Sequence, residues 1–123
     1  MGLFGVGVAA ALAVALPEKI DILLIEKGEM AEVHVVVSHL RARSRSGSFE
    51  RDLRKEERER LGSAAMRAMA ATELRRGCGK GEVYVSLTVD GKTAATAVCP
   101  QSSEELFGPW KVLIATVRAV AVR

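Results

Sequence analysis

The dipeptide Asp90-Gly91 is the feature that most constrains how this chain can fold. It lies between two runs of β-type residues, Glu82–Val89 and Lys92–Cys99. An Asp-Gly pair suits a type I′ turn, because both central residues of that turn need positive φ angles. We therefore predict a β-hairpin with a two-residue turn. The expected cross-strand pairs are Leu87 with Ala94, Val85 with Thr96 and Val83 with Val98.

The rest of the pattern predicts an α+β fold. The run Glu32–Val37 is rich in β-branched residues and indicates a central strand. Ser48 is placed to cap a helix that ends at the cationic turn before Gly77. Apolar residues at steps of three and four predict a second helix from about Gly108-Pro109, although an edge strand is the competing interpretation. We expect a small antiparallel sheet, formed by strand, helix, β-hairpin and C-terminal helix, with the helices on one face.

Residues 1–29 are expected to lie outside a single domain formed by residues 30–123. Met1–Leu16 is apolar and uncharged, but it lacks the positive start of a signal peptide. It is also shorter than the roughly 20 residues that span a bilayer. Glu26–Met30 could be encoded by a purine-rich ribosome-binding site, which would make Met30 the natural start. We expect no membrane attachment and a cytoplasmic location.

A dinucleotide-binding unit is an alternative interpretation of the N-terminal segment. Gly5-Val6-Gly7 precedes an Ala-rich stretch and the acid-ended run Asp21–Lys27. That motif needs a strand before its glycines, and only four residues precede them here. We therefore predict no dinucleotide and no other cofactor.

Catalysis and metal binding find little support in the residue pattern. Cys78 and Cys99 lack metal-type spacing, and neither histidine has a second cysteine pair nearby. A cysteine nucleophile with His34 or His39 as base would lack a third, orienting group. We predict a non-enzymatic protein without a metal, in which the two thiols are free or form a Cys78–Cys99 disulfide.

Six basic side chains could contact nucleic-acid phosphates. The chain has 18 Lys and Arg residues against 15 Asp and Glu residues, a formal charge of +3. Leu40–Phe49 is rich in Arg and Ser and indicates a loop or a fraying strand end, which could be a basic arm or a solvated segment. The candidates are Arg41, Arg43, Arg45, Arg75, Arg76 and Lys80. They make an RNA-binding module the alternative function.

The C-terminal stripe supplies the candidate protein-binding residues. The chain is 49% hydrophobic but only 4% aromatic, so its core would be thin and would favour burial against a second chain. The expected interface anchors are Leu106, Trp110, Leu113 and Val117. The alternative for each is packing on this protein's own sheet.

Glu82–Val98, Ser102–Leu106 and Lys111–Val120 together resemble the small dimerising subunit of KEOPS, the archaeal and eukaryotic tRNA-modifying complex. The resemblance spans residues 31–123 and departs from the family pattern at residues 40–60 and at Gly108-Pro109. It implies a non-catalytic homodimer that pairs through its sheet. Its helices would hold the subunit that makes threonylcarbamoyladenosine on tRNA. The excess of Arg over Lys and the absence of Asn suit a GC-rich genome or a heat-loving organism.

Overall fold

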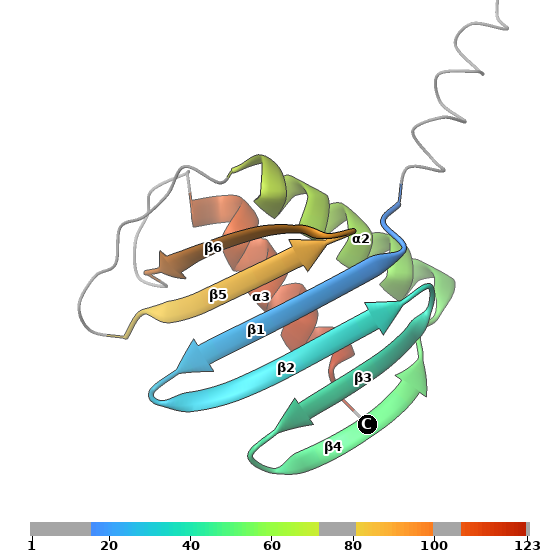
Figure 1. The fold of residues 1–123 in the computed structure, drawn as a ribbon, viewed down its shortest axis with the longest axis horizontal. Helices are drawn as coiled ribbons and strands as arrows, with labels where there is room; N and C mark the ends of the chain where they lie inside the picture. Colours follow the sequence, from blue (N-terminus) through green and yellow to red (C-terminus); the bar gives the residue numbers. More distant parts are fainter. Residues whose placement is uncertain (1–15, 72–80, 100–106, 123) are drawn as a thin grey trace, which may run out of the picture.

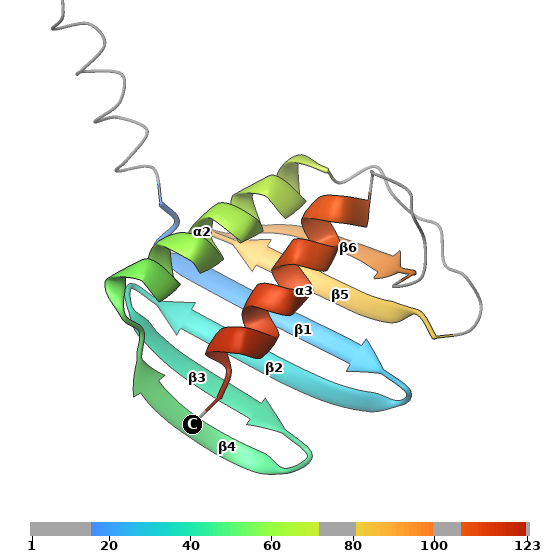
Figure 2. The same ribbon diagram turned by 180° about the vertical axis from the view of Figure 1, so that it is seen from behind.

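The computed structural model describes residues 16–71, 81–99 and 107–122. They form an α+β fold in which one six-stranded antiparallel sheet carries two helices on the same face (Figures 1 and 2). The strands are ordered β4-β3-β2-β1-β5-β6 across the sheet. The elements are β1 (Lys19–Glu26), β2 (Glu29–Val36), β3 (His39–Ser44), β4 (Gly47–Asp52), α2 (Lys55–Ala70), β5 (Val83–Val89), β6 (Lys92–Val98) and α3 (Gly108–Val120).

The predicted hairpin is confirmed. Asp90 and Gly91 have φ angles of 47° and 88°, as a type I′ turn requires. The cross-strand pairs between β5 and β6 are the expected ones. Lys27 and Gly28, with φ angles of 52° and 76°, form the equivalent two-residue turn between β1 and β2.

Strand β1 lies in the middle of the sheet, so the prediction that residues 1–29 lie outside the core is wrong for this strand and its turn. It pairs with β2 on one side and with β5 on the other. Ile20, Ile22 and Leu24 point into the core and are at most 7% exposed. The intervening residues point outward, which is the two-residue period of a half-buried strand. The start of β1 is tied to the hairpin turn by Lys19 and Asp90, because each backbone N–H donates to an oxygen of the other residue.

Two alternatives were predicted for Leu40–Phe49, a loop or a fraying strand end, and the loop is wrong, because this segment forms β3, a tight turn and the start of β4. Leu40 and Ala42 are buried while Arg41 and Arg43 are exposed, so the arginines occupy the outward positions of a strand. The following helix starts later than expected. Residues 47–52 pair with β3, and α2 begins at Lys55.

The C-terminal segment is a helix, as predicted, with Pro109 in its first turn. Trp110, Leu113 and Val117 are at most 2% exposed. The indole Nε1–H of Trp110 donates to the carbonyl of Ala71 at 2.9 Å. These three side chains belong to the protein's own core and are not surface anchors, because α3 turns its most apolar side toward the sheet and α2. Leu106 lies outside the described residues.

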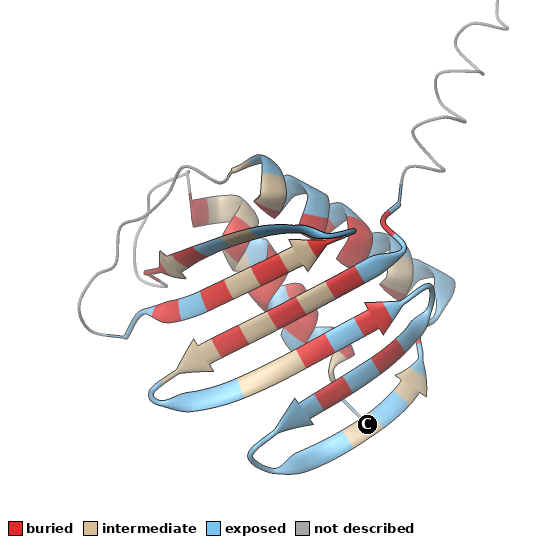
Figure 3. Ribbon diagram, in the orientation of Figure 1, coloured by how far each residue is buried: buried red, intermediate tan, exposed pale blue. Residues whose placement is uncertain are grey.

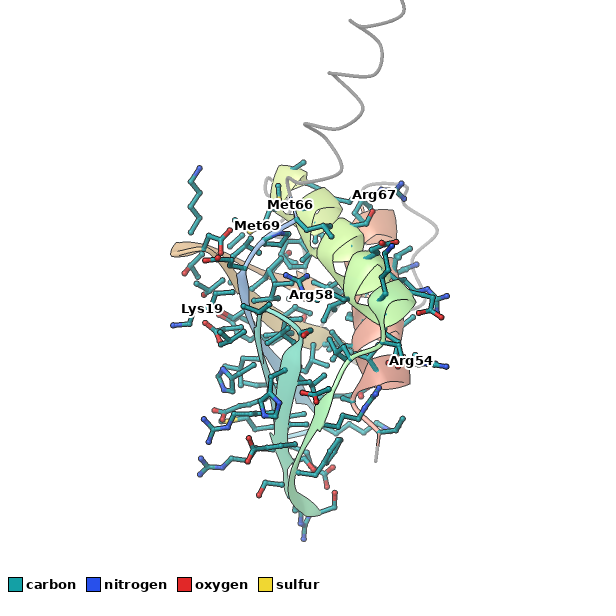
Figure 4. All side chains as sticks on the ribbon, turned by 90° about the vertical axis from the view of Figure 1, so that its right-hand side faces the viewer. Lys19, Arg54, Arg58, Met66, Arg67 and Met69 are labelled. Atoms are coloured by element: carbon teal, nitrogen blue, oxygen red, sulfur yellow. The ribbon has the colours of Figure 1, made fainter. Side chains whose placement is uncertain are left out.

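The charged side chains of helix α2 lie in two different environments, one between the helix and the sheet and one facing away from the sheet (Figure 4). Arg58 points into the space between α2 and the sheet, whereas Arg54 and Arg67 point away from the sheet (Figure 4). The guanidinium of Arg58 donates to the carbonyls of Pro17 and Val37. Burial lowers the Arg58 pKa from its ordinary value. Arg58 thus fixes the entry of β1 and the turn after β2 to the helix layer.

Candidate protein-binding surfaces

The sheet face opposite the helices is uncovered by any described element, and we call it the open face. Figure 3 shows exposed residues alternating with buried ones along its strands. In Figure 4, Lys19 points away from the helices on this side. The register places on it Lys19, Asp21, Leu23, Ile25, Met30, Glu32, His34, Val36, His39, Arg41, Arg43, Ser48, Glu50, Asp52, Tyr84, Ser86, Thr88, Thr93, Ala95 and Ala97.

Both histidines lie on the open face beside carboxylates. His39 Nε2 is 2.8 Å from Glu50 Oε1, and its Nδ1 is 3.0 Å from Asp52 Oδ1. His34 Nδ1 is 2.7 Å from Asp21 Oδ1. Hydrogen bonds to Glu50 and then Asp52 raise the pKa of His39 above 6.5. A ring whose two nitrogens both face carboxylates favours the protonated form and has no free lone pair with which to act as a general base.

The cysteines predicted as possible nucleophiles are not brought to these histidines by the described structure. Cys99 is buried, and Cys78 lies outside the described residues together with the proposed disulfide. Within the described ranges, no group of three His, Cys, Asp or Glu side chains could hold a metal ion. None of the helices described here has the length and apolar character needed to cross a membrane.

The basic candidates on β3 and its turn are accompanied by acids. Arg41 Nε is 3.7 Å from a Glu50 oxygen, and Arg45 Nη1 is 3.1 Å from a Glu29 oxygen. On the open face, three Lys and Arg side chains stand among four carboxylates. A phosphate backbone would therefore meet negative charge beside each arginine. Arg75, Arg76 and Lys80 lie outside the described residues.

The two edges of the sheet differ sharply in charge. Strand β4 has three charged residues among six, namely Glu50, Arg51 and Asp52. Strand β6 has one charged residue among seven, Lys92 at its start. No described strand pairs with the outer side of β6. Charged residues on an edge strand discourage pairing with another chain, so β4 is protected while β6 is not.

An apolar area of the open face adjoins the β6 edge. One cross-strand row contains Met30, Ile25, Tyr84 and Ala97. Tyr84 is 40% exposed and Met30 52% exposed. We call these four side chains, together with Leu23 and Ala95 of the next row, the apolar corner. The corner adjoins the part of the β6 edge that follows Lys92, and the side chains of β6 from Thr93 to Val98 are all uncharged.

Sequence reasoning located β6 but did not identify it as an edge. That required the position of β1, because β1 takes the inner side of β5 and leaves β6 outermost. The signal available in the sequence was that Lys92–Val98 has a single charged residue, whereas the segment that forms the other edge, Gly47–Asp52, has three. No protein-family model and no curated protein matches this chain.

Proposed function

We propose that this protein is a non-catalytic protein-binding module that takes an extended segment of a partner protein on the outer edge of β6. The observation that carries the proposal is the contrast between the β6 edge, whose single charged residue is Lys92 at its start, and the β4 edge, which has three charged residues among six. An unpaired edge offers its backbone N–H and C=O groups to an added strand. Backbone pairing then supplies affinity, and neighbouring side chains supply selectivity.

The side chains of β6 indicate what the added segment contains. Thr93, Ala95 and Ala97 line the open-face side of the edge, and Ala94 and Val98 lie on the helix side. Because these side chains are small, they leave room for larger neighbours on the incoming strand. A segment with β-branched or aromatic residues at alternate positions would pack on them and on Tyr84. Charged residues facing the apolar corner would weaken binding, since they would lose water without gaining a partner.

Membership in a threonylcarbamoyladenosine-forming complex is a finer proposal. It rests on the hairpin and the C-terminal helix, which are present in the structure as predicted. Four strands precede α2, where the resemblance assumes one. The apolar corner favours partner binding at the sheet edge over binding through the buried stripe of α3. RNA binding through Arg41 and Arg43 is the second candidate, and the adjacent carboxylates count against it.

A peptide titration tests the β6 proposal. The probe is a peptide with the sequence of β5, Val83–Val89, with two lysines added at each end for solubility. Backbone amides of β6 that face outward should exchange with deuterium at least about tenfold more slowly when the peptide is bound. Amides of β4 should be unaffected. Protection of β4 instead of β6, or of neither, would refute strand addition at this edge.

Matched lysine variants make the test specific to one edge. Ala95 and Ser48 lie at opposite ends of a single cross-strand row and are both exposed. Ala95→Lys should weaken peptide binding at least about tenfold, because a lysine on an edge strand discourages pairing with another strand and repels the peptide's own lysines. Ser48→Lys should leave binding unchanged. Equal effects of both variants would indicate a general charge effect and contradict the proposal.

A further inference from the structure

The chain enters β1 across one side of helix α2. Leu16 lies against Gly62 in the middle of the helix, where a Cβ atom on the glycine would be 2.9 Å from Leu16 Cδ2 and 3.5 Å from Pro17 Cδ. Pro17 is buried, and its carbonyl accepts a hydrogen bond from the Arg58 guanidinium. Glycine is a poor helix former, and here its missing side chain leaves the space that Leu16 occupies. The residues that lead into β1 are therefore held against the surface of α2.

Beyond this contact, the same side of α2 is apolar. Met66 and Met69 follow Gly62 at steps of four and three, so they lie on one side of the helix. Met66 is 46% exposed, and Met69 is partly buried. In Figure 4, both lie on the side of α2 that the chain reaches from β1, whereas Arg67 points away from the sheet. We call Gly62, Met66, Met69 and the adjacent Ala70 the methionine stripe.

The side of α2 that faces away from the sheet has a different character. Its exposed residues are Glu56, Arg60, Ser63 and Arg67, which are typical of a solvated helix face. Methionine side chains are flexible and adapt to an irregular apolar neighbour. The methionine stripe is therefore suited to packing against an apolar segment.

The segment that precedes Leu16 has the matching chemistry. Residues 1–17 contain no Asp, Glu, Lys, Arg or His, and apart from the glycines and Pro17 every residue is apolar. Fifteen residues reach up to about 50 Å when extended. The methionine stripe runs only about 12 Å from Gly62 to Ala70. The segment is thus long enough to cover the whole stripe.

The attachment at Leu16 favours this segment over any free partner. A segment tethered this closely has an effective concentration at the stripe on the order of millimolar. We infer that residues 1–15 of the same chain cover the methionine stripe of α2, continuing from the contact of Leu16 with Gly62. The chain thereby supplies its own apolar partner for this side of the helix.

Paramagnetic relaxation in NMR spectra tests the placement. A nitroxide label on Ala10→Cys, in a full chain that also carries Cys78→Ser, leaves the buried Cys99 unlabelled. The methyl signals of Met66 and Met69 should be lost. The methyl signal of Met30, which lies on the open face, should be kept. Retention of all three signals, or equal loss at Met30, would overturn the inference.

The same label distinguishes this occupant from two others. Spin-labelled chains are mixed with chains that carry only ¹³C-labelled methionine methyl groups. The methyl signals should persist in the mixture, because the contact lies within one chain. Their loss would assign the segment to a second copy. Recovery of the Met66 signal in the singly labelled protein when phosphatidylcholine vesicles are added would assign it to lipid. Either result would overturn the inference.

Matched charge variants test the contribution of the methionine stripe. Elastase cleaves after small apolar residues, which are frequent in residues 8–15, and its rate follows the population in which they are uncovered. Met66→Glu should accelerate this cleavage at least about tenfold, because covering the stripe would bury an unpaired carboxylate. Ser63→Glu, on the outward side of α2, and the conservative Met66→Leu should each change it less than about twofold. Equal rates in all these proteins would contradict the inference.

This inference is independent of strand addition at β6. Met66→Glu should leave peptide protection of β6 intact, whereas Ala95→Lys should leave the loss of the Met66 signal intact. Slow exchange of the outward β6 amides without peptide, together with an unaffected Met66 signal, would place the segment on β6 and reject the methionine stripe. Circular dichroism of each variant shows that the fold is retained, so that a change in cleavage is not a loss of structure.

Discussion

The guanidinium of Arg51 on β4 holds the carboxylate of Glu57 on α2 with two hydrogen bonds, 2.7 Å from Nη2 to Oε2 and 3.1 Å from Nη1 to Oε1. The same Nη2 donates to the carbonyl of Val120, at the end of α3, at 2.7 Å. One side chain thus connects the β4 edge to both helices. The Arg51 and Glu57 side chains are 25% and 10% exposed, so the pair is largely shielded from water.

Replacing Arg51 with methionine should reduce the free energy of unfolding by roughly 2–4 kcal/mol, because it leaves the Glu57 carboxylate buried without its main partner. Denaturant unfolding followed by circular dichroism measures the loss. Arg54 is the matched control, since its side chain is 76% exposed and lies 3.4 Å from the same carboxylate. Arg54→Met should cost less than about 1 kcal/mol. Equal losses would mean that the Arg51 contact has no special role.

Acid should weaken the fold through Glu57. Hydrogen bonds from the Arg51 side chain and the Arg54 backbone lower the Glu57 pKa from 4.5 to about 2. Because the folded-state pKa is depressed, the stabilisation is complete above about pH 4.5 and is lost as the pH falls toward 2. In Glu57→Gln, the free energy of unfolding should be lower near neutral pH and should vary less between pH 4.5 and 2. An unchanged slope in this variant would assign the acid sensitivity to other carboxylates.

His39 should titrate above pH 6.5, and the shift should depend on its two carboxylate neighbours. The hydrogen bond to Glu50 is the larger cause and that to Asp52 the next. NMR titration of the imidazole protons should therefore show a lower pKa in Glu50→Gln and a smaller decrease in Asp52→Asn. Any stabilisation from these contacts is present at low pH and is lost as the pH rises through the raised pKa. A larger effect of Asp52→Asn would reverse this order of causes.

Neighbouring residues of β1 should respond very differently to truncation. Ile22 is 2% exposed and points into the core, whereas Leu23 is only partly buried and lies on the open face. Ile22→Ala should reduce the free energy of unfolding by about 2–5 kcal/mol through lost packing and a residual cavity. Leu23→Ala should cost about 1 kcal/mol or less. Thermal or denaturant unfolding of the pair checks the central placement of β1, and similar losses would contradict it.

Trp110 reports whether the C-terminal stripe is internal. It is the chain's single tryptophan and is 0% exposed. Its fluorescence emission should be at short wavelength and should resist quenching by acrylamide at every protein concentration, because its own core shields it. An interface anchor would instead become exposed on dilution.

The sequence allowed the hairpin and the last helix to be predicted because both have local signals. Asp90-Gly91 favours one turn type, and the stripe around Leu113 follows a helical period. Strand β3 was not predicted as a regular strand, because Arg41 and Arg43 at its outward positions resemble part of a basic loop. The inward residues, Leu40 and Ala42, alternate with these arginines as a half-buried strand requires. The alternation of apolar and charged residues was present in the sequence. The pairing with β2 shows that this alternation belongs to a strand.

The central position of β1 depends on pairing with a segment that lies far away in the chain, and no local sequence pattern predicts such pairing. Its residues pair with β5 residues that lie 57 to 69 positions later in the chain, and this pairing makes β6 an edge. The candidate surface on β6 therefore could not be inferred before the strand order was known. The orientation of α3 was similarly undetermined by the local sequence pattern. Its residues were assigned to a helix, but which side faced the core was set by α2 and the sheet.

The pairing of β1 with β5 also orders events during synthesis. Strands β1 to β4 form a meander of neighbours that can assemble as soon as they emerge, because each turn joins adjacent segments. The other edge of β1 must wait until residues 83–89 are made, a delay of roughly 3–12 seconds at ordinary translation rates. During that interval, one edge of β1 has backbone N–H and C=O groups that lack their strand partner. A β5 strand from a neighbouring nascent chain fits it equally well, so a domain-swapped pair is the misassembled product that this topology favours.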